Sequence, residues 1–550
     1  MWKYCLDNSC FFITRVYFYI ALSEGFPHIL ANFYVVKHFK GGISLDLRTV
    51  FEYSIERHPQ KVAIIDGDRR YTYRQLGLEV NSVASSLHRL GVNKNDRIAV
   101  LLKNRFETVV IFWAIQKLGA IFAGINVRQS QEIVHYCLSD LESKFVIYDV
   151  STEYLINKKR FMERPVFINI DGNGGDINYE ELKKQESYDF NPNQINENDL
   201  AVILYTSGTT GNPKGVPRSH QNEYAAAFAH IFQCHYEWHD STLGVVPLYH
   251  TMGLRSLLSM VLLNGTFIIL RDFDSYEAIQ LIEQENINSL YLLPNMYHDM
   301  ATLPEANKSN FNELRTIVYA GAPMTSKLIG LCMEVFRPKY FINHYGSTEI
   351  YTYSYCDHIS EKPGCVGKPG IHQNLRIIEP DISRSKTPAD TVKDGEIGEI
   401  IVHIGSPESF KGYWNKPDHT KRSVIQNWFY TGDLGYKDED GDMFVIGRLD
   451  EMILHAGDNI YPIEVESVLL EHEKVQEAVV VGEDDERWGQ VVVAYIVPSD
   501  PSLTVNELDL FCKRHPKLSN YKRPRKYIFQ ASFPKTAVGK IMRKKIKSSY

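Results

Sequence analysis

The sequence predicts a large α/β domain followed by a small α+β domain. From about residue 45, helical and strand patterns alternate, which is typical of parallel strands covered by helices on both faces. After about residue 380, short strands and Gly/Asp turns replace that alternation. At 550 residues, the chain is also too long for one compact domain.

The elements of the large domain, expected over residues 45–446, follow from their patterns. Apolar residues at helical spacing predict helices over residues 47–55, 76–90 and 106–118, and Gly91 ends the second. Continuous apolar runs predict buried strands. These runs are residues 61–66, 97–102, 144–148, 200–205, 266–270, 289–293 and 316–319.

The small domain is expected over residues 447–550. Before it, residues 395–402 are typical of a short strand, and residues 438–445 (DEDGDMFV) predict a hairpin with a Gly-containing turn. From Lys517 onward the chain has 11 Lys or Arg and no Asp or Glu. A solvated basic face and a surface that meets phosphates both remain open as interpretations.

The first 44 residues form an atypical extension, aromatic and apolar without a clear period. It is an ordered extra element, a weak membrane-surface patch, or the product of a misplaced translation start. Residues 11–22 (FFITRVYFYIAL) are shorter than the roughly 20 apolar residues of a membrane span and contain Arg15. They also lack the leader and cleavage site of a signal peptide. We therefore expect a cytoplasmic protein without firm membrane association.

Composition restricts the class of protein further. Hydrophobic residues make up 44% of the chain and charged residues 23%, which excludes a mainly disordered or fibrous chain. A formal net charge of -7 argues against a dedicated nucleic-acid binder. The eight cysteines include no C-x-x-C pair. Neither a disulfide scaffold nor a zinc module is expected, and a reducing compartment is the default.

The strongest local signal is the run YTSGTTGNPKGV at residues 205–216, between an apolar strand and a helical pattern over residues 218–235. Small residues let backbone N–H groups approach an anion, and hydroxyls can bind phosphate or a cation. Lys214 adds a mobile positive charge. The spacing is not that of the ordinary P-loop. The other candidate phosphate-binding residues are Thr206, Ser207, Gly208, Thr209 and Thr210.

This run resembles the phosphate loop of the adenylate-forming superfamily: acyl- and aryl-CoA synthetases, peptide-synthetase adenylation domains and luciferases. Further family blocks follow in order, and the resemblance covers residues 45–550. The blocks are PLYHTMG (247–253), YAGAPM (319–324), HYGSTE (344–349), GYWN (412–415), YTGDLG (430–435), GRLDEMI (447–453) and PKTAVGKIMR (534–543). The resemblance implies a small distorted β-barrel within the large domain and a mobile C-terminal domain.

The resemblance also implies a two-step reaction. A carboxylate attacks the α-phosphorus of ATP to give an acyl-adenylate and pyrophosphate, and a thiol then displaces AMP to form a thioester. Because the first step brings two anions together, the site must neutralise charge and hold an in-line geometry. Lys540 is expected to bridge the carboxylate and the α-phosphate. Glu349 and the hydroxyl of Thr209 are expected to hold Mg²⁺, which prefers oxygen ligands.

Nucleotide contacts are implied for several blocks. Asp433 would accept both ribose hydroxyls, and Arg448 would reach ribose or phosphate. Tyr345 would lie flat against adenine, with the backbone of residues 321–323 on the other face. The remaining expected nucleotide-binding residues are Gly321, Ala322, Pro323, His344, Gly346, Ser347 and Thr348.

Asp450 lies where the family has its hinge, so the small domain is expected to rotate there between the half-reactions. In one pose Lys540 enters the site. In the other, the loop at residues 455–460 (HAGDNI) would line a tunnel for the pantetheine arm of CoA. Some family members have Arg or Lys where this chain has Asn459, so a charged contact is not carried over to that position.

The acid and the acceptor stay open at this stage. His250 resembles the gate residue of the acyl pocket, whose wall should include residues near Met252, Ala320 and His344. Alternate tyrosines in residues 350–355 (IYTYSY) would lie on one side of a strand, which slightly favours an aromatic over a long-chain acid.

Because no carrier domain with a phosphopantetheine serine follows Lys540, free CoA is the leading acceptor, with ATP and Mg²⁺ as the other cofactors. The alternative is a stand-alone adenylation enzyme that loads a separate carrier protein. A luciferase-like oxygenase and a binding module with dead chemistry are less favoured. The oligomeric state stays open.

Overall fold

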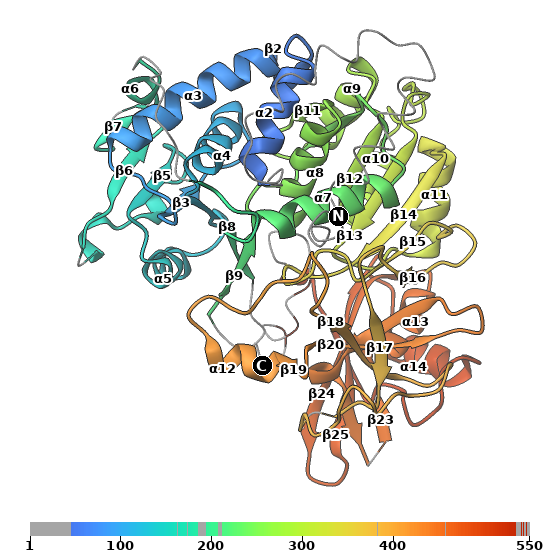
Figure 1. Ribbon diagram of the computed structural model, residues 1–550. Helices are drawn as coiled ribbons and strands as arrows, with labels where there is room; N and C mark the ends of the chain where they lie inside the picture. The colour runs from blue at the N-terminus through green and yellow to red at the C-terminus, as the bar shows by residue number, and fades with distance from the viewer. Residues whose placement is uncertain are drawn as a thin grey trace, which may run out of the picture. The chain divides into compact units, whose positions relative to one another are not determined.

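The computed structural model describes residues 46–550 with several gaps, so the extension at residues 1–44 lies outside the described residues. The gaps are residues 162, 173, 185–193, 207–211, 382, 457, 535–540, 542, 544–545 and 547–550. The described chain has a large N-terminal α/β domain with two extensive sheets, and a smaller C-terminal domain with its own sheet (Figure 1).

The seven-stranded sheet has the order β7-β6-β5-β3-β4-β8-β9 and is parallel except for the edge strand β9, which runs antiparallel to β8. Its strands are β3 (Arg97–Leu101), β4 (Ile121–Gly124), β5 (Phe145–Tyr148), β6 (Val166–Asn169), β7 (Ile177–Asn178), β8 (Leu200–Thr206) and β9 (Lys214–Ser219). The helices are α3 (Tyr73–Arg89), α4 (Phe106–Leu118), α5 (Gln131–Leu141) and α6 (Tyr179–Lys183). Ile98 and Val100 join the core formed with α3 and α4, whereas Ala99 and Leu101 join a second core with α5. Both faces of β3 are therefore covered, as the unbroken apolar run predicts.

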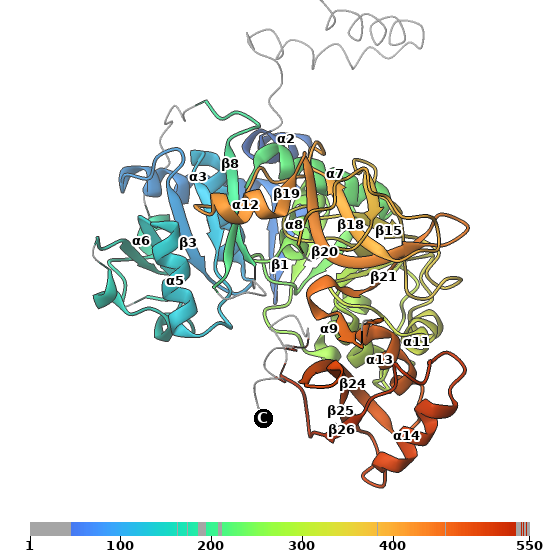
Figure 2. The same cartoon turned by 90° about the horizontal axis from the view of Figure 1, so that it is seen from below.

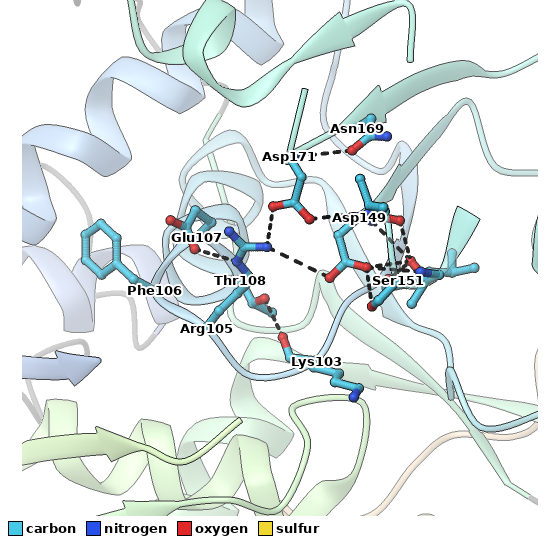
Figure 3. A network of polar contacts seen from close by, with 12 residues as sticks. Lys103, Arg105, Phe106, Glu107, Thr108, Asp149, Ser151, Asn169 and Asp171 are labelled. Carbon is cyan, nitrogen blue, oxygen red and sulfur yellow. Dashed lines mark hydrogen bonds and ion pairs between the residues drawn. The ribbon is translucent and has the colours of Figure 1, made fainter. Parts of the chain in front are cut away.

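Arg105, which precedes α4, connects the carboxyl ends of three strands of this sheet (Figure 3). Its Nε donates to Oε2 of Glu107 at 2.6 Å, and its Nη1 donates to Oδ1 of Asp171 at 2.6 Å. The same Nη1 lies 3.9 Å from Oδ2 of Asp149. Because Asp149 follows β5 and Asp171 follows β6, this charged network holds neighbouring loops together at one edge.

The larger sheet has the order β17-β18-β20-β21-β16-β15-β14-β13-β12-β10-β11-β1-β2, with β19 beside β20. From β14 to β1 its strands are parallel, and the strands on the β17 side are antiparallel. Its strands are β1 (Val62–Asp66), β2 (Arg69–Thr72), β10 (Ser241–Gly244), β11 (Thr266–Ile269), β12 (Ser289–Leu292), β13 (Thr316–Ala320), β14 (Tyr340–Tyr345), β15 (Ser354–Cys356), β16 (Cys365–Pro369), β17 (Leu375–Ile378), β18 (Gly398–His403), β19 (Val424–Ile425), β20 (Trp428–Lys437) and β21 (Met443–Arg448). The antiparallel strands enclose a core of their own, in the region where a small barrel was expected.

Helices accompany the parallel part of the larger sheet. They are α2 (Leu47–Arg57), α7 (His220–Gln233), α8 (Thr251–Leu262), α9 (Ser275–Gln284), α10 (Pro294–Ala301) and α11 (Ser326–Phe336), and α12 (Pro417–Ser423) precedes β19. Helices α7 and α8 lie side by side (Figures 1 and 2). Among the described helices, none is both long enough and apolar enough to span a bilayer.

The C-terminal sheet has the order β23-β22-β25-β24, with β26 parallel to β25. Its elements are β22 (Ile453–His455), β23 (Asp458–Ile460), α13 (Pro462–Leu470), β24 (Val475–Asp485), β25 (Gly489–Pro498), α14 (Val505–Arg514) and β26 (Lys526–Phe529). Figure 2 shows α13, α14, β24, β25 and β26. Alternate residues of β24 and β25 pack against α13 and α14, so this domain has a separate hydrophobic core.

The structure bears on the expected hairpin near residue 440 and on the expected helix after the phosphate-loop run. The hairpin expected over residues 438–445 is confirmed: β20 and β21 pair across a turn in which Gly441 has φ +78°. The helix expected over residues 218–235 begins later, because residues 214–219 form β9. Ser219 then caps α7 by accepting a hydrogen bond from the backbone N–H of Asn222.

Candidate functional site

The phosphate-loop run lies at the hairpin between β8 and β9. Thr206 and Lys214 are paired across this hairpin. The other expected phosphate-binding residues, Ser207, Gly208, Thr209 and Thr210, lie outside the described residues.

The Lys214 ammonium is half-buried, 4.5 Å from the ring centroid of Tyr413. Burial lowers its pKa, the charge of Arg448 lowers it further, and the charge of Glu349 opposes both. The hairpin therefore brings a cation into the neighbourhood of the carboxylate that was expected to hold Mg²⁺.

Glu349 is held in place by a tyrosine from another block. Its side chain is buried, with 8% of the residue exposed, and its Oε1 accepts a hydrogen bond from the Tyr413 hydroxyl at 2.7 Å. Its backbone N–H donates to the Ser347 hydroxyl at 3.2 Å. The sequence analysis assigned no role to Tyr413, although the GYWN block that contains it was a visible signal. This tyrosine orients the carboxylate.

We expect the substitution Tyr413→Phe to weaken Mg²⁺ use without destroying the fold. Partners that orient a metal ligand typically contribute about 10- to 100-fold in affinity or activity. The Mg²⁺ concentration for half-maximal pyrophosphate release should therefore rise about 10-fold. Tyr179→Phe is the matched control, since Tyr179 donates to Oε1 of Glu79 at 3.0 Å elsewhere in the domain. Equal shifts in both variants would contradict the role of Tyr413.

Tyr345, Asp433 and Arg448 are adjacent in space although they come from three separate blocks. The Tyr345 hydroxyl donates to Oδ2 of Asp433 at 2.6 Å, and Nη1 of Arg448 donates to Oδ1 of Asp433 at 2.7 Å. Burial raises the pKa of Tyr345 well above its usual value, and the Asp433 charge adds to this. Both carboxylate oxygens therefore have partners that fix the plane of the Asp433 side chain.

Arg448 lies at the end of β21. Burial alone would lower its pKa, but the charge of Asp433 and their hydrogen bond outweigh burial and raise it. Its Nη1 also donates to the carbonyl oxygen of Thr431 at 2.8 Å, and its Nε lies 3.5 Å from Oδ1 of Asp450. The expected hinge residue thus contacts the expected ribose-site arginine.

The expected adenine segments follow neighbouring parallel strands. Ala320 ends β13 and pairs with His344 on β14. Gly321 then has φ +87°, which favours glycine, and leads into Ala322 and Pro323. In open α/β sheets, ligands bind outside the carboxyl ends of such strands.

The loop after β14 is closely packed. A Cβ on Gly346 would lie 2.1 Å from the Tyr351 carbonyl oxygen, so only glycine fits there. The Ser347 hydroxyl accepts from the Tyr353 hydroxyl at 2.6 Å, and the Thr348 carbonyl oxygen accepts from Nη1 of Arg218 at 3.3 Å. These contacts hold the loop that presents Glu349.

His250 lies at the N-terminus of α8. It lines a surface pocket, and its buried Nε2 has no hydrogen-bond partner among the described residues. Burial lowers its pKa to about 4, with the charge of Arg128 as a second cause, so its ring is neutral at pH 7. The main pocket-lining residues are Val127, Arg128, Pro247, Tyr249, His250, Leu293 and Met296.

Arg255 lies one turn along α8 from Met252, and only 1% of it is exposed. Its Nη1 donates to the Thr352 hydroxyl at 2.7 Å and lies 3.4 Å from Nδ1 of His344. Its Nε is buried without a partner among the described residues. Its guanidinium also lies 4.9 Å from the ring centroid of Tyr351. The sequence analysis did not single out this residue.

The expectation that the alternate tyrosines share one side of a strand is wrong. Strand β15 begins only at Ser354, so Tyr351 and Tyr353 precede it. Tyr351 faces the two buried arginines, Tyr353 contacts Ser347, and Tyr355 lies 6.3 Å from the His344 ring. The tight loop after β14 turns successive side chains toward different neighbours.

The expected second-step elements are described only in part. Lys540 lies outside the described residues. Asp450 lies in a short 3₁₀ turn (Leu449–Glu451). The expected tunnel loop is a hairpin of β22 and β23 in which Leu454 pairs with Asn459. His455 Nδ1 lies 2.7 Å from the Gln490 carbonyl oxygen.

Two family models match the chain. The AMP-binding enzyme model covers residues 51–414, and the model of the AMP-binding enzyme C-terminal domain covers residues 464–540.

Similar proteins span nearly the same length. The 2-succinylbenzoate–CoA ligase of Geobacillus sp. is 32% identical over 496 residues, which cover 89% of this chain and 94% of the relative. The long-chain-fatty-acid–CoA ligase FadD13 of Mycobacterium tuberculosis is 29% identical over 88% of this chain and 94% of its own.

Solved structures of o-succinylbenzoate CoA synthetase (MenE) from Bacillus subtilis are also similar. The complex with the acyl-adenylate OSB-AMP has a TM-score of 0.80 and 29% identity, covering 91% of this chain and 98% of that one. The complex with ATP and a magnesium ion has a TM-score of 0.78 and 28% identity, covering 91% of this chain and 99% of that one.

Proposed function

The chain belongs to the AMP-binding enzyme family as an AMP-forming acyl- or aryl-CoA ligase, and we propose that its acid carries a second anionic group bound by Arg255. The enzyme uses ATP and Mg²⁺ to convert the acid into an acyl-adenylate and pyrophosphate, and transfers the acyl group to CoA with release of AMP. We place this reaction in the cytoplasm, where ATP and CoA are available.

The proposed nucleotide site follows the geometry after β13 and β14. Tyr345 and the backbone of residues 321–323 would hold adenine, and Asp433 would accept the ribose hydroxyls. Glu349, oriented by Tyr413, would hold Mg²⁺ together with Thr209. A hard cation with carboxylate, hydroxyl and phosphate ligands suits this donor set. When bound, it neutralises charge on the phosphates.

Three further residues are proposed to act in these steps, in the roles expected from the sequence. Asp450 is proposed as the hinge, His250 as the gate, and Lys540 as the residue that bridges the two reacting anions. The phosphate loop would be completed by Thr206, Ser207, Gly208, Thr210 and Lys214.

The observation that carries the proposal for the acid is a buried cation without a counterion. Two fully buried arginines lie near Tyr351, and Arg218 is ion-paired with the buried Glu223. Among the described residues, no carboxylate lies within ion-pair distance of Arg255. An unpaired buried charge costs several kcal/mol. A ligand carboxylate would remove that cost.

The neighbours of Arg255 cannot supply the missing charge. Because a guanidinium only donates, Nδ1 of His344 accepts, which assigns the ring proton to Nε2. Burial lowers the pKa of His344 well below its usual value, and the Arg255 charge lowers it further. Nε2 of His344 then points to the Cys234 thiol at 3.4 Å. Burial also raises the pKa of that thiol well above its usual value. These neighbours are therefore neutral.

The position of Arg255 and the residues around it favour an aromatic acid with two anionic groups. His344 directly precedes Tyr345, so Arg255 lies next to the proposed adenine site, and its guanidinium is 5.5 Å from the Tyr291 ring centroid. The Geobacillus relative is named for 2-succinylbenzoate, an aromatic acid with two carboxylates. A long aliphatic tail would leave Arg255 buried without a counterion.

The first test is pyrophosphate release against matched acids, with and without CoA. We expect sustained turnover with an aromatic diacid when CoA is present, and much slower turnover with its monoacid and with fatty acids. A single burst that CoA does not relieve would instead support the alternative in which the adenylate is loaded onto a separate carrier protein. Preference for fatty acids would refute the role proposed for Arg255 but not the ligase reaction.

Arg255→Met tests the counterion directly. Breaking a buried charge pair costs about 3–5 kcal/mol, so kcat/KM for the diacid should fall by at least about 100-fold. The monoacid should lose little. Arg255→Lys keeps the charge and should retain part of the preference for the diacid. Equal losses for both acids in the two variants would contradict the proposal.

A further inference from the structure

A second cluster of ligating side chains lies where β15, β16 and β21 adjoin. It contains Cys356 at the end of β15, Cys365 at the start of β16, and His358 between them. Their ligand atoms all lie within 4.8 Å of one another. We propose that Cys356, His358 and Cys365, with Asp442, form a structural zinc site.

The distances between the ligand atoms would suit a tetrahedral ion once the three side chains move slightly closer together. Zn–S bonds of about 2.3 Å and Zn–N bonds of about 2.0–2.1 Å place neighbouring ligand atoms roughly 3.5 Å apart. Both cysteines are fully buried and His358 is half-buried, so the site would be closed from solvent on the thiol side. Thiolate and imidazole ligands together favour Zn²⁺ over a hard cation.

The backbone around Cys365 stabilises a thiolate. The N–H of Gly367 donates to Sγ of Cys365 at 3.0 Å, and a hydrogen bond to the charged form favours that form. Gly367 has φ +73°, and a Cβ there would lie 1.9 Å from the Tyr355 carbonyl oxygen. Only glycine fits this turn, which directs its N–H at the sulfur.

His358 already has the outer partners that metal-bound histidines require. Its Nδ1 lies 3.1 Å from Oδ1 of Asp357, and its Nε2 lies 3.1 Å from Oδ2 of Asp442. In zinc sites one ring nitrogen binds the metal while the other donates to a carboxylate. Because Asp442 lies on the Nε2 side, Nε2 would bind zinc, and the contact between Nδ1 and Asp357 would remain.

Asp442 would supply the fourth ligand through Oδ1, because its Oδ2 already accepts from the Lys362 ammonium at 2.8 Å. Only 3% of it is exposed, and its buried Oδ1 has no hydrogen-bond partner among the described residues. It directly precedes β21, whose first residues pair with β16: Met443 with Gly367 and Phe444 with Cys365. This places the carboxylate beside the strand that holds the thiol. A buried oxygen without a partner is costly, and a metal bond would satisfy it.

Two other candidate metal clusters among the described residues are less suitable. The acidic group of Asp438, Asp440 and Asp442 is already occupied by the Lys362 ammonium, which contacts all three carboxylates. In the cluster of His230, Cys234 and His344, the nearby Arg255 charge repels a cation.

The test measures metal in the full chain. Protein purified without chelators should contain about one zinc per chain by mass spectrometry of the metal. After zinc removal, Co²⁺ should produce thiolate-to-cobalt charge-transfer bands that Zn²⁺ abolishes. The melting temperature should fall on zinc removal and recover on reloading, because a structural zinc contributes folding energy.

Variants identify the ligands. Cys356→Ser and Cys365→Ser should lose zinc and the cobalt bands, whereas Cys332→Ser, at a buried free cysteine on α11, should retain both. Wild-type protein that holds no zinc and shows no cobalt bands would overturn the proposal, even if the variants do not fold. A Cys356–Cys365 disulfide in protein kept under reducing conditions would also overturn it. Neither result would affect the ligase assignment.

Discussion

Lys540→Ala should abolish adenylate formation yet leave thioester formation from supplied acyl-AMP largely intact. The first step brings the acid carboxylate and the α-phosphate together, and a cation between them stabilises the charge that develops in the transition state. Removing one such group typically costs about 10²–10³-fold in kcat. The second step starts from the finished adenylate, so it does not have to bring those two anions together.

The two steps can be measured separately. Pyrophosphate release reports the first, and CoA-thioester formation from synthetic acyl-AMP reports the second. Lys535→Ala is the matched control, since it removes a lysine from the same segment and should leave both rates near wild type. An equal loss of both half-reactions in Lys540→Ala would contradict the proposed alternation of the C-terminal domain about Asp450.

Glu349→Gln should reduce adenylation nearly as strongly. The amide keeps an oxygen that can accept from the Tyr413 hydroxyl, so the side chain can stay in place while its charge is lost. A metal ion contributes several kcal/mol of charge stabilisation in such reactions, which corresponds to roughly 10²–10³-fold in rate. The rate of adenylation should fall most at low Mg²⁺ and should partly recover at high Mg²⁺.

The measurement is the Mg²⁺ dependence of pyrophosphate release at saturating ATP and acid. Glu361→Gln, at an exposed carboxylate outside the site, is the control and should follow the wild-type curve. A Glu349→Gln curve with the wild-type midpoint and maximum would show that this carboxylate does not hold the ion. The Mg²⁺ curve of Tyr413→Phe should lie between those of the wild type and Glu349→Gln, because this substitution disturbs only the orientation of Glu349.

The fold class could be predicted because it is recorded in local periodicity. The apolar run of residues 97–102 became β3, and both of its faces are covered by helices. The helix expected over residues 218–235 was given a start that is too early, because residues 218–219 belong to a strand. Residues 214–219 form β9 through pairing with β8, a contact that a local pattern does not record.

Much of the candidate site could also be placed in advance. The blocks that contain Tyr345, Asp433 and Arg448 were expected to serve one nucleotide, and the structure brings the three side chains into direct contact. Tyr413 was missed because its role depends on a hydrogen bond to a carboxylate 64 residues away in the chain. The expectation that the tyrosines of residues 350–355 lie on one side of a strand was wrong, because the turn that precedes β15 depends on the close packing of Gly346.

The sequence by itself determined the α/β class and the order of the family blocks, since these depend on local residue types and their spacing. The resemblance that the blocks carry implied the two-step chemistry. Only the tertiary structure decided that Arg255 is buried with no counterion among the described residues, and that Cys356, His358 and Cys365 converge. The cysteine spacing had argued against a zinc module. Burial and unpaired charge arise from contacts between distant segments, and a linear pattern does not contain them.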